Sequence, residues 1–171
     1  MPKKKNYGKR FEEDFKNSVD ESKMIVEREK DSMAFNSRGK NPYDFRIYHY
    51  PNIFFFELKS TGSASVSLQE NIVRTHQIEE LKKRKKYKGV FAGFLLEFRE
   101  KKLKTKTREH KVYYLDIDNF LKKQKGKKSL SIDDVKSLGG IEVEAHKKVT
   151  RYTMNINKLI KDIRNSSTKT Q

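Results

Sequence analysis

The sequence predicts a mixed α/β fold, a sheet flanked by helices in a single domain, and three observations support that prediction. Helical and strand-like patterns follow one another along 171 residues in the order helix, strands, helix, strands, helices. Eleven Phe and eight Tyr supply apolar surface for a core, although 37% of the residues are charged. No internal repeat or interdomain linker interrupts the chain. We therefore expect one domain over residues 1–171, with an ordered core at about 8–163 and a frayed tail at 165–171.

The first two elements follow from local patterns. Phe11, Phe15 and Val19 recur at the period of one helical face, so a helix should begin near Gly8 and extend to about Lys30. The β-prone runs 45–48 and 53–56 flank a turn signal at 50–52 and predict a hairpin. The later expectations are a helix over 69–86 with a break near Thr75 as a candidate N-cap, a strand pair over 90–98 and 111–115, short helices after Asp116 or Asp118 and after Ser131, a strand at 152–154, and a helix over 155–163.

Charge indicates the class of partner. Lys and Arg number 40 against 23 Asp and Glu, a formal net charge of +17. Such a field attracts polyanions, so nucleic acid is the expected partner, with an anionic membrane surface or a ribosome-like scaffold as alternatives. The chain has no cysteine, which excludes disulfides and thiolate zinc sites. Apolar runs stay far below the roughly 18 residues that span a bilayer, and no signal core is present, so we expect a soluble cytoplasmic protein without membrane association.

Common catalytic motifs are missing from the sequence. The four histidines show no metal-ligand spacing, and no serine lies in a nucleophile elbow. Neither GxxxxGK[ST] nor GxGxxG occurs, so we expect no nucleotide cofactor.

The sharpest local feature is a pair of acids that the hairpin would bring together. If Tyr48 faces Ile53, the same register places Asp44 directly across from Glu57. Facing side chains in an antiparallel pair lie about 4.5 to 5.5 Å apart at Cβ, where two carboxylates repel unless a cation lies between them. Mg²⁺ prefers such oxygen ligands. Lys59 shares the strand face of Glu57, so it could orient a water or stabilise charge on a phosphate.

Two structural alternatives stay open. The triplet acid-x-Lys recurs through this Lys-rich chain, as at Asp14 and Glu80, so Glu57-Leu58-Lys59 could instead belong to a solvated strand face. Glu12, near the start of the first helix, could complete the acidic cluster, or it could simply pair with Lys16 one turn later. The basic runs 82–88, 101–111 and 122–128 are each solvated charge, but together they could flank a surface that binds a nucleic-acid backbone.

At these residues the chain resembles a known family. Asp44, twelve residues and then Glu57-Leu58-Lys59 resemble the core of the PD-(D/E)xK nucleases, and more closely the RecU-type Holliday-junction resolvases of Gram-positive bacteria and their phages. Further matches occur in the same order: Gly8 with Glu12, Leu68-Gln69 with Asn71, His76-Gln77-Ile78-Glu79, Gly126-Lys127-Lys128-Ser129, and 157–163. The resemblance thus covers about residues 8–163, although each motif by itself is weak.

The resemblance implies a restriction-endonuclease-like fold and a set of roles. Asp44 and Glu57 would bind Mg²⁺, with Mn²⁺ as a substitute, Lys59 would be the catalytic lysine, and Glu12 would assist from the helix. The residues implied in DNA binding or in supporting the site are Gln69, Gln77, Lys127 and Lys128, together with Arg38 and Lys40 at the tip of a shortened stalk over 24–43. Tyr43 departs from the family pattern, which has a small hydroxyl residue before the catalytic Asp.

The expected function is therefore a homodimeric, Mg²⁺-dependent endonuclease that resolves four-way DNA junctions by paired nicks, in the cytoplasm of a bacterium or a phage-infected host. Two alternatives remain. The first is a nuclease of the same chemistry that acts on other DNA. The second is a non-catalytic basic nucleic-acid-binding protein in which Asp44 and Glu57 are structural.

Overall fold

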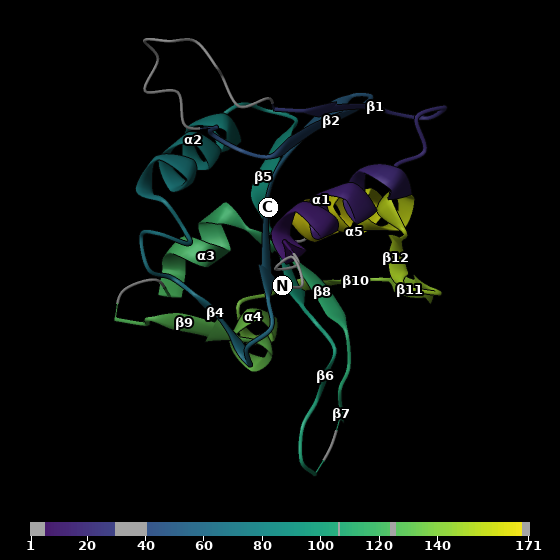
Figure 1. Ribbon diagram of the computed structural model, residues 1–171. Helices are drawn as coiled ribbons and strands as arrows, with labels where there is room; N and C mark the ends of the chain where they lie inside the picture. The colour runs from purple at the N-terminus through teal and green to yellow at the C-terminus, as the bar shows by residue number, and fades with distance from the viewer. Residues whose placement is uncertain (1–5, 30–40, 106, 124–125, 169–171) are drawn as a thin grey trace, which may run out of the picture.

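The fold is organised around a six-stranded mixed sheet with helices on both faces (Figure 1). The computed structural model describes residues 6–29, 41–105, 107–123 and 126–168. The strand order is β1-β2-β3-β5-β8-β10, and β3 and β5 are parallel while the other neighbours are antiparallel. The strands are β1 (Ile25–Arg28), β2 (Phe45–His49), β3 (Asn52–Thr61), β5 (Val90–Phe98), β8 (Lys111–Asp116) and β10 (Ile141–Val143). This architecture confirms the expected mixed α/β class, a sheet flanked by helices.

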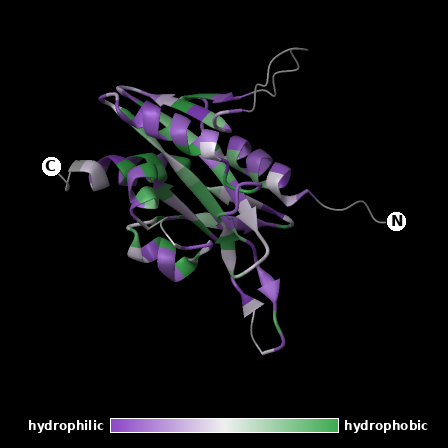
Figure 2. Cartoon of the chain, turned by 90° about the vertical axis from the view of Figure 1, so that its left-hand side faces the viewer, coloured by the Kyte–Doolittle hydropathy of each residue, from purple (hydrophilic) through white to green (hydrophobic). Residues whose placement is uncertain are grey.

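The helices form one layer on each side of the sheet. Helices α1 (Tyr7–Ser18) and α5 (Ile156–Thr168) cover one face. Helices α2 (Thr75–Lys85), α3 (Ile117–Lys123) and α4 (Ile132–Ser137) cover the other. Figure 2 shows hydrophobic residues concentrated on the central strands, whereas the helices carry both hydrophobic and hydrophilic residues. In the described part of the chain, no helix is long and apolar enough to cross a membrane.

Strand β3 divides its side chains between the two cores. Phe54, Phe56 and Leu58 are buried in the cluster beneath α1 and α5. Phe55 is buried in the opposite cluster, beneath α2 and α3. This is the period-2 alternation of a strand that is buried on both faces. It assigns Glu57 and Lys59 to the α2 side of the sheet.

The β2–β3 hairpin has the register that the sequence predicted. Tyr48 lies opposite Ile53, and Phe45 lies opposite Phe56. The ladder continues one pair further into the turn than expected, because His49 also pairs with Asn52. The turn is therefore shorter than the expected four residues, but the pairing of every residue toward Asp44 is unchanged.

Two helix boundaries differ from the prediction. Helix α1 ends at Ser18 rather than near Lys30, and residues 25–28 form the edge strand β1 beside β2. Helix α2 begins at Thr75 rather than at residue 69, and Thr75 is its first helical residue, not its N-cap. The Glu70 carboxylate accepts hydrogen bonds from the Thr75 backbone N–H at 2.9 and 3.1 Å, so the preceding segment is a turn that caps the helix.

The C-terminal helix is longer than expected. We expected it to end near Ile163, with a frayed tail from residue 165, but α5 continues through Thr168. The Ser166 hydroxyl donates to the Ile163 carbonyl oxygen at 2.8 Å, and the Ser167 hydroxyl donates to the same oxygen at 3.2 Å. Polar side chains thus satisfy carbonyl groups of the last turns instead of ending the helix.

Among the described residues, three short strand pairs lie outside the main sheet. They are β4 (Ser65–Ser67) with β9 (Ser129–Ser131), β6 (Lys101–Lys102) with β7 (Thr107–Arg108), and β11 (Ala145–Lys148) with β12 (Arg151–Met154). The β6–β7 hairpin continues from β5 and β8 and projects from the body of the molecule (Figure 1). The strand pair predicted from the sequence thus ends in a projecting basic arm.

Candidate active site

The acidic pair lies where the β2–β3 hairpin meets α2. Asp44 is the residue before β2, and its backbone N–H donates to the Phe56 carbonyl oxygen at 3.0 Å. This bond extends the ladder by one step and places Asp44 beside Glu57. The sequence register therefore locates both carboxylates correctly.

Asp44 is held by the strand that it faces. Its Oδ2 accepts a hydrogen bond from the Leu58 backbone N–H at 2.7 Å. Burial raises the pKa of Asp44 to about 6, and the negative charge of Glu12 adds to this rise, while the Leu58 hydrogen bond opposes it. The Asp44 carboxylate is fixed in orientation and carries a charge that the protein alone does not fully compensate.

Glu57 is the most buried group of the site, with 1% of its surface exposed. Its Oε1 accepts from Gln77 Nε2 at 2.6 Å and lies 2.7 Å from Lys59 Nζ. Its Oε2 is also buried, but has no hydrogen-bond partner among the residues that the structure describes. Burial and the neighbouring charge of Asp44 raise the pKa of Glu57 to about 8. A buried carboxylate oxygen without a donor is costly, so this oxygen points to a missing positive group.

Lys59 and Gln77 complete the network. Lys59 Nζ donates to Gln77 Oε1 at 3.2 Å, and 15% of the Lys59 side chain is exposed. Gln77 comes from the first turn of α2, and its Oε1 also accepts from the Arg74 backbone N–H at 3.3 Å. One amide therefore caps the helix, holds the lysine and donates to Glu57. The sequence expectation that Gln77 lies near the site is consistent with this position.

Glu12 reaches the same cavity from α1, where its carboxylate is paired with Arg28 of β1. The sequence left open a pairing with Lys16, and the structure has Arg28 in that place. The sequence could not reveal this partner, because residues 25–28 were expected to be helical. Strand β1 instead brings Arg28 across to α1.

A cavity of about 390 Å³ opens over the acidic pair. Its lining residues are Glu12, Asn41, Asp44, Glu57, Leu58, Lys59, Asn71, Ile72, Arg74 and Gln77. In the described ranges no group of three or more His, Asp or Glu side chains is gathered as a metal site. The fit of a divalent cation therefore rests on the carboxylates of Asp44 and Glu57, and on the unpartnered Oε2 of Glu57 in particular. Carboxylate oxygens are hard donors, and Mg²⁺ is usually held by one or two carboxylates together with water and phosphate oxygens. The two residues therefore fit such an ion.

The other residues expected to bind DNA lie elsewhere. Gln69 is exposed and does not line the cavity. Lys127 is ion-paired with Asp134, and Lys128 is exposed on a loop whose backbone accepts from the Leu68 N–H at 3.0 Å. Arg38 and Lys40 lie outside the described residues, as do all of residues 30–40 of the expected stalk, while the start of that segment belongs to β1.

Three polar residues of the cavity were not singled out from the sequence as site residues. Asn41 lies before the β2–β3 hairpin, and its carbonyl oxygen is 3.2 Å from His76 Nε2. Arg74 precedes α2, and Asn71 lies in the turn before it. Asn71 belonged to a recognised motif, so a signal existed for it. Nothing in the local pattern of Asn41 or Arg74 indicates that tertiary folding places them over Glu57.

The fold and the cavity together define a mixed α/β sheet that presents the buried Glu57, the half-buried Asp44 and Lys59 at one cavity. No family model matches the chain. It is 35% identical to the SPbeta prophage-derived uncharacterized protein YotM of Bacillus subtilis (strain 168) over 173 aligned positions, covering 90% of this chain and 85% of the relative. The chain therefore belongs to the family of that prophage protein.

A solved structure is also similar in fold. It is Hjc of Archaeoglobus fulgidus, a Holliday junction resolvase from an archaeal hyperthermophile. The similarity covers 71% of this chain and 84% of Hjc, with a TM-score of 0.41 and 12% sequence identity.

Proposed function

We propose that this protein is a divalent-metal-dependent endodeoxyribonuclease, with Asp44 and Glu57 as metal ligands and Lys59 as the catalytic lysine. The observation that carries the proposal is the buried Glu57 Oε2, which has no hydrogen-bond donor in the described part of the chain although it lies beside Asp44 and an open cavity. Two carboxylates with raised pKa values need a positive charge between them to ionise together. A bound Mg²⁺ supplies that charge and polarises a phosphate oxygen.

The chain's own residues then position the reactants. The Leu58 N–H fixes the Asp44 carboxylate, and Gln77 fixes Glu57. Lys59 Nζ remains partly exposed to the cavity, so it can donate to the attacking water or to the phosphate as negative charge develops. Glu12, held by Arg28, supports the site from the helix side. Gln77 also keeps Lys59 at the strand end, which makes it a positioning residue.

The proposed substrate is a four-way DNA junction, and the proposed active form is a homodimer. The net charge of +17 supports a polyanionic partner. The order and spacing of the matches to the RecU-type resolvases support junction cleavage. One cluster of Asp44, Glu57 and Lys59 supplies one nick, whereas clean resolution requires two symmetric nicks, which a twofold dimer provides. The prophage origin of the Bacillus subtilis relative supports action inside a bacterial host.

A single cleavage experiment separates this function from its alternatives. Wild-type protein and the variant Glu57→Gln are incubated with an end-labelled four-way junction and with a linear duplex of the same sequence, in Mg²⁺ or in EDTA. We expect paired nicks in the junction by the wild-type protein in Mg²⁺ only, with the duplex largely intact. Glu57→Gln should bind the junction within a few-fold of wild type but not nick it.

Each alternative has its own outcome in the same experiment. Equal cutting of the linear duplex would favour a nuclease that acts on other DNA. Tight junction binding with no cutting in Mg²⁺ or Mn²⁺ would favour the non-catalytic binding protein. Sedimentation of the free and the junction-bound protein tests the dimer, since a monomer in both states would contradict paired nicking by two copies.

A further inference from the structure

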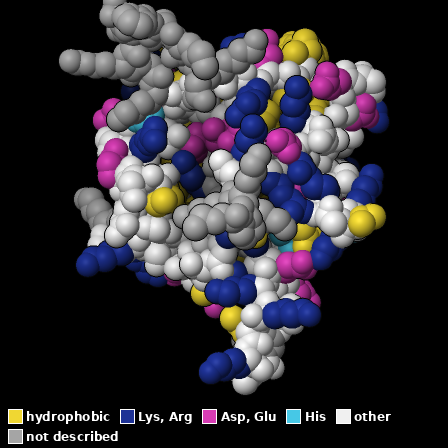
Figure 3. Space-filling model, viewed as in Figure 1, with side chains coloured by type: hydrophobic (Ala, Val, Ile, Leu, Met, Phe, Trp, Pro, Cys, Tyr) yellow, Lys and Arg dark blue, Asp and Glu magenta, His cyan; other side chains and the backbone are white. Residues whose placement is uncertain are grey.

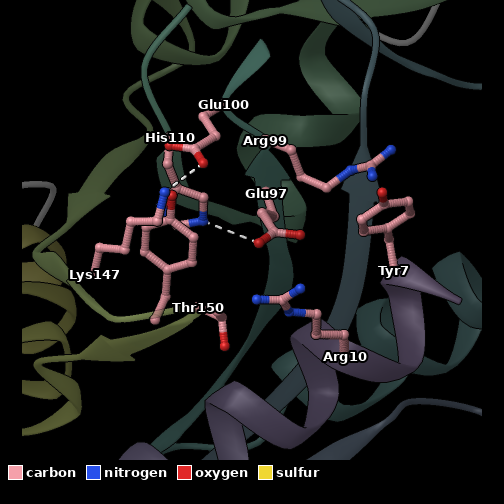
Figure 4. A pocket seen from close by; sticks show the side chains of 9 residues that line it. Tyr7, Arg10, Glu97, Arg99, Glu100, His110, Lys147 and Thr150 are labelled. Carbon is pink, nitrogen blue, oxygen red and sulfur yellow. Dashed lines mark hydrogen bonds and ion pairs between the residues drawn. The ribbon is translucent and has the colours of Figure 1, made fainter. Parts of the chain in front are cut away.

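A second polar cavity, of about 230 Å³, lies at the far end of β5, on the side of the sheet covered by α1 (Figure 4). Its centre is Glu97, which is 5% exposed. Glu97 accepts a hydrogen bond from the hydroxyl of Ser60, and its Oε1 lies 2.9 Å from His110 Nε2. His110 is in turn stacked on Tyr152, with ring centres 3.5 Å apart. Both carboxylate oxygens of Glu97 therefore already have a polar neighbour within the protein.

Two guanidinium groups line the same cavity with unused donors. The Arg99 guanidinium carbon lies 3.5 Å from the centre of the Tyr7 ring, and Arg10 approaches from the first turns of α1 (Figure 4). Within the described ranges neither arginine forms an ion pair, and Arg99 Nε is buried without a hydrogen-bond acceptor. The other acid of the cavity, Glu100, is paired with Lys147 at 2.5 Å. Both arginines thus lack an anion.

Arg108 ties the backbone at Arg99 to that at Gly62, next to the Arg99 guanidinium. Arg108 donates to the carbonyl oxygens of Gly62 at 2.7 Å and of Arg99 at 3.0 Å. A Cβ added at Gly62 would lie 2.4 Å from a terminal nitrogen of Arg99. The absence of a side chain at residue 62 therefore leaves the space that this guanidinium fills.

We propose that this cavity binds a phosphate group of the DNA backbone, away from the bond that is cut. A planar guanidinium matches two phosphate oxygens, and two guanidiniums that form no ion pair among the described residues favour an anion at this cavity. The inference rests on the proposed function for the identity of the polymer. It adds a contact that the catalytic cluster does not contain.

The surroundings favour a polynucleotide over a small free anion. The projecting β6–β7 hairpin begins directly after Glu100 and exposes Lys101, Lys102 and Lys104. Figure 3 shows Lys and Arg side chains on this projection and in the centre of the face above it. A single phosphate ion in the cavity could not reach the hairpin, whereas a DNA arm can contact both.

The cavity is also joined to the catalytic cluster through neighbouring residues. Ser60, which donates to Glu97, follows Lys59 on β3, and their side chains lie on opposite faces of the sheet. On α1, Arg10 lines this cavity and Glu12, two residues later, lines the catalytic one. The two cavities are therefore linked through residues of β3 and α1.

The test measures binding of a labelled junction in EDTA, so that cleavage plays no part. Arg99→Ala and Arg10→Ala should each raise the dissociation constant about five- to ten-fold near physiological salt. Each should also reduce the slope of log affinity against log salt by about 0.9, the value for one lost phosphate contact. Lys161→Ala removes the same charge from an exposed position on α5 and should stay within about two-fold of wild type.

Gly62→Ala is the sharper variant, because it leaves the net charge unchanged. Its Cβ should push the Arg99 guanidinium out of place and weaken junction binding in the same direction as Arg99→Ala. Thermal unfolding of each variant shows whether it is folded, and Arg10→Ala decides the matter if the substitutions at residues 62 and 99 unfold the chain. Binding by the folded variants as tight as that of Lys161→Ala would overturn the proposal.

Two further outcomes have distinct meanings. Calorimetry measures the binding of inorganic phosphate to wild-type protein and to Arg99→Ala. If Arg99→Ala abolishes phosphate binding but leaves DNA affinity unaltered, the cavity binds a free anion and the proposed DNA contact is overturned. If wild-type protein binds the junction but never cuts it, the nuclease function fails while the phosphate site is still tested by the same binding data.

Discussion

Gln77 donates a hydrogen bond of 2.6 Å to the buried Glu57 carboxylate and accepts one of 3.2 Å from the Lys59 ammonium. A single side chain of α2 therefore sets the positions of two groups on β3. The Glu57 carboxylate and the Lys59 ammonium are therefore held by α2 as well as by their own strand. This relationship makes the start of α2 part of the proposed chemistry.

Gln77→Ala should reduce the rate of cleavage at saturating DNA by one to two orders of magnitude while leaving junction affinity within a few-fold. The reason is that a misplaced catalytic group lowers kcat more than it changes binding. Gln69→Ala is the matched control, because Gln69 is exposed and does not line the cavity. Single-turnover cleavage of the junction measures both variants. Equal cleavage rates for Gln77→Ala and Gln69→Ala would contradict a positioning role for Gln77.

Lys59→Ala should abolish measurable cleavage with much less effect on affinity. Its ammonium lies 2.7 Å from Glu57 and faces the cavity rather than the surrounding solvent. Removing a group that stabilises only the charge developing in the transition state lowers the cleavage rate without weakening the binding of the DNA substrate. Junction binding in EDTA measures the affinity, and cleavage in Mg²⁺ measures the rate. A fall in affinity as steep as the fall in rate would make Lys59 an ordinary phosphate contact.

The metal-free protein should lose stability as the pH rises from about 4.5 to about 8. Burial raises the folded-state pKa of Glu57 from 4.5 to about 8, so the folded state binds more protons than the unfolded state in this interval. The free energy of unfolding therefore falls with pH there. Glu57→Gln removes this contribution, so the difference in melting temperature between variant and wild type should grow in the variant's favour toward pH 8. A difference that does not change with pH would contradict the buried, repelled carboxylate.

Mg²⁺ should reverse that loss. An ion that binds only the folded state stabilises it by about 2.7 kcal/mol at one hundred times its dissociation constant. About 1 kcal/mol shifts the melting temperature of a domain of this size by roughly 2–4 °C. We therefore expect a rise of several degrees for the wild-type protein at pH 8 and none for the double variant Asp44→Asn/Glu57→Gln. Calorimetric titration with Mg²⁺ and with Mn²⁺ checks the same site without DNA.

The sequence by itself determined the order of the main elements and the register of one hairpin. Because the period of a strand is two, the sequence of β3 fixes which of its side chains share a face. That period and one turn sufficed to place Asp44 across from Glu57 and Lys59 on the same side. Local cues failed where distant groups decide the structure. Residues 25–28 were expected to continue the first helix, but they form a strand because β2 offers an edge to pair with.

Only the tertiary structure decided what surrounds the acidic pair. Arg28 reaches Glu12, and Gln77 reaches Glu57, across separations of 16 and 20 residues. The second cavity joins α1, β5 and the β11–β12 connection, so no local pattern contains it. Local periodicity indicates only which face of a helix or strand is turned toward the core. The burial of Glu57 and the unused donor of Arg99 depend instead on which other elements pack against these residues.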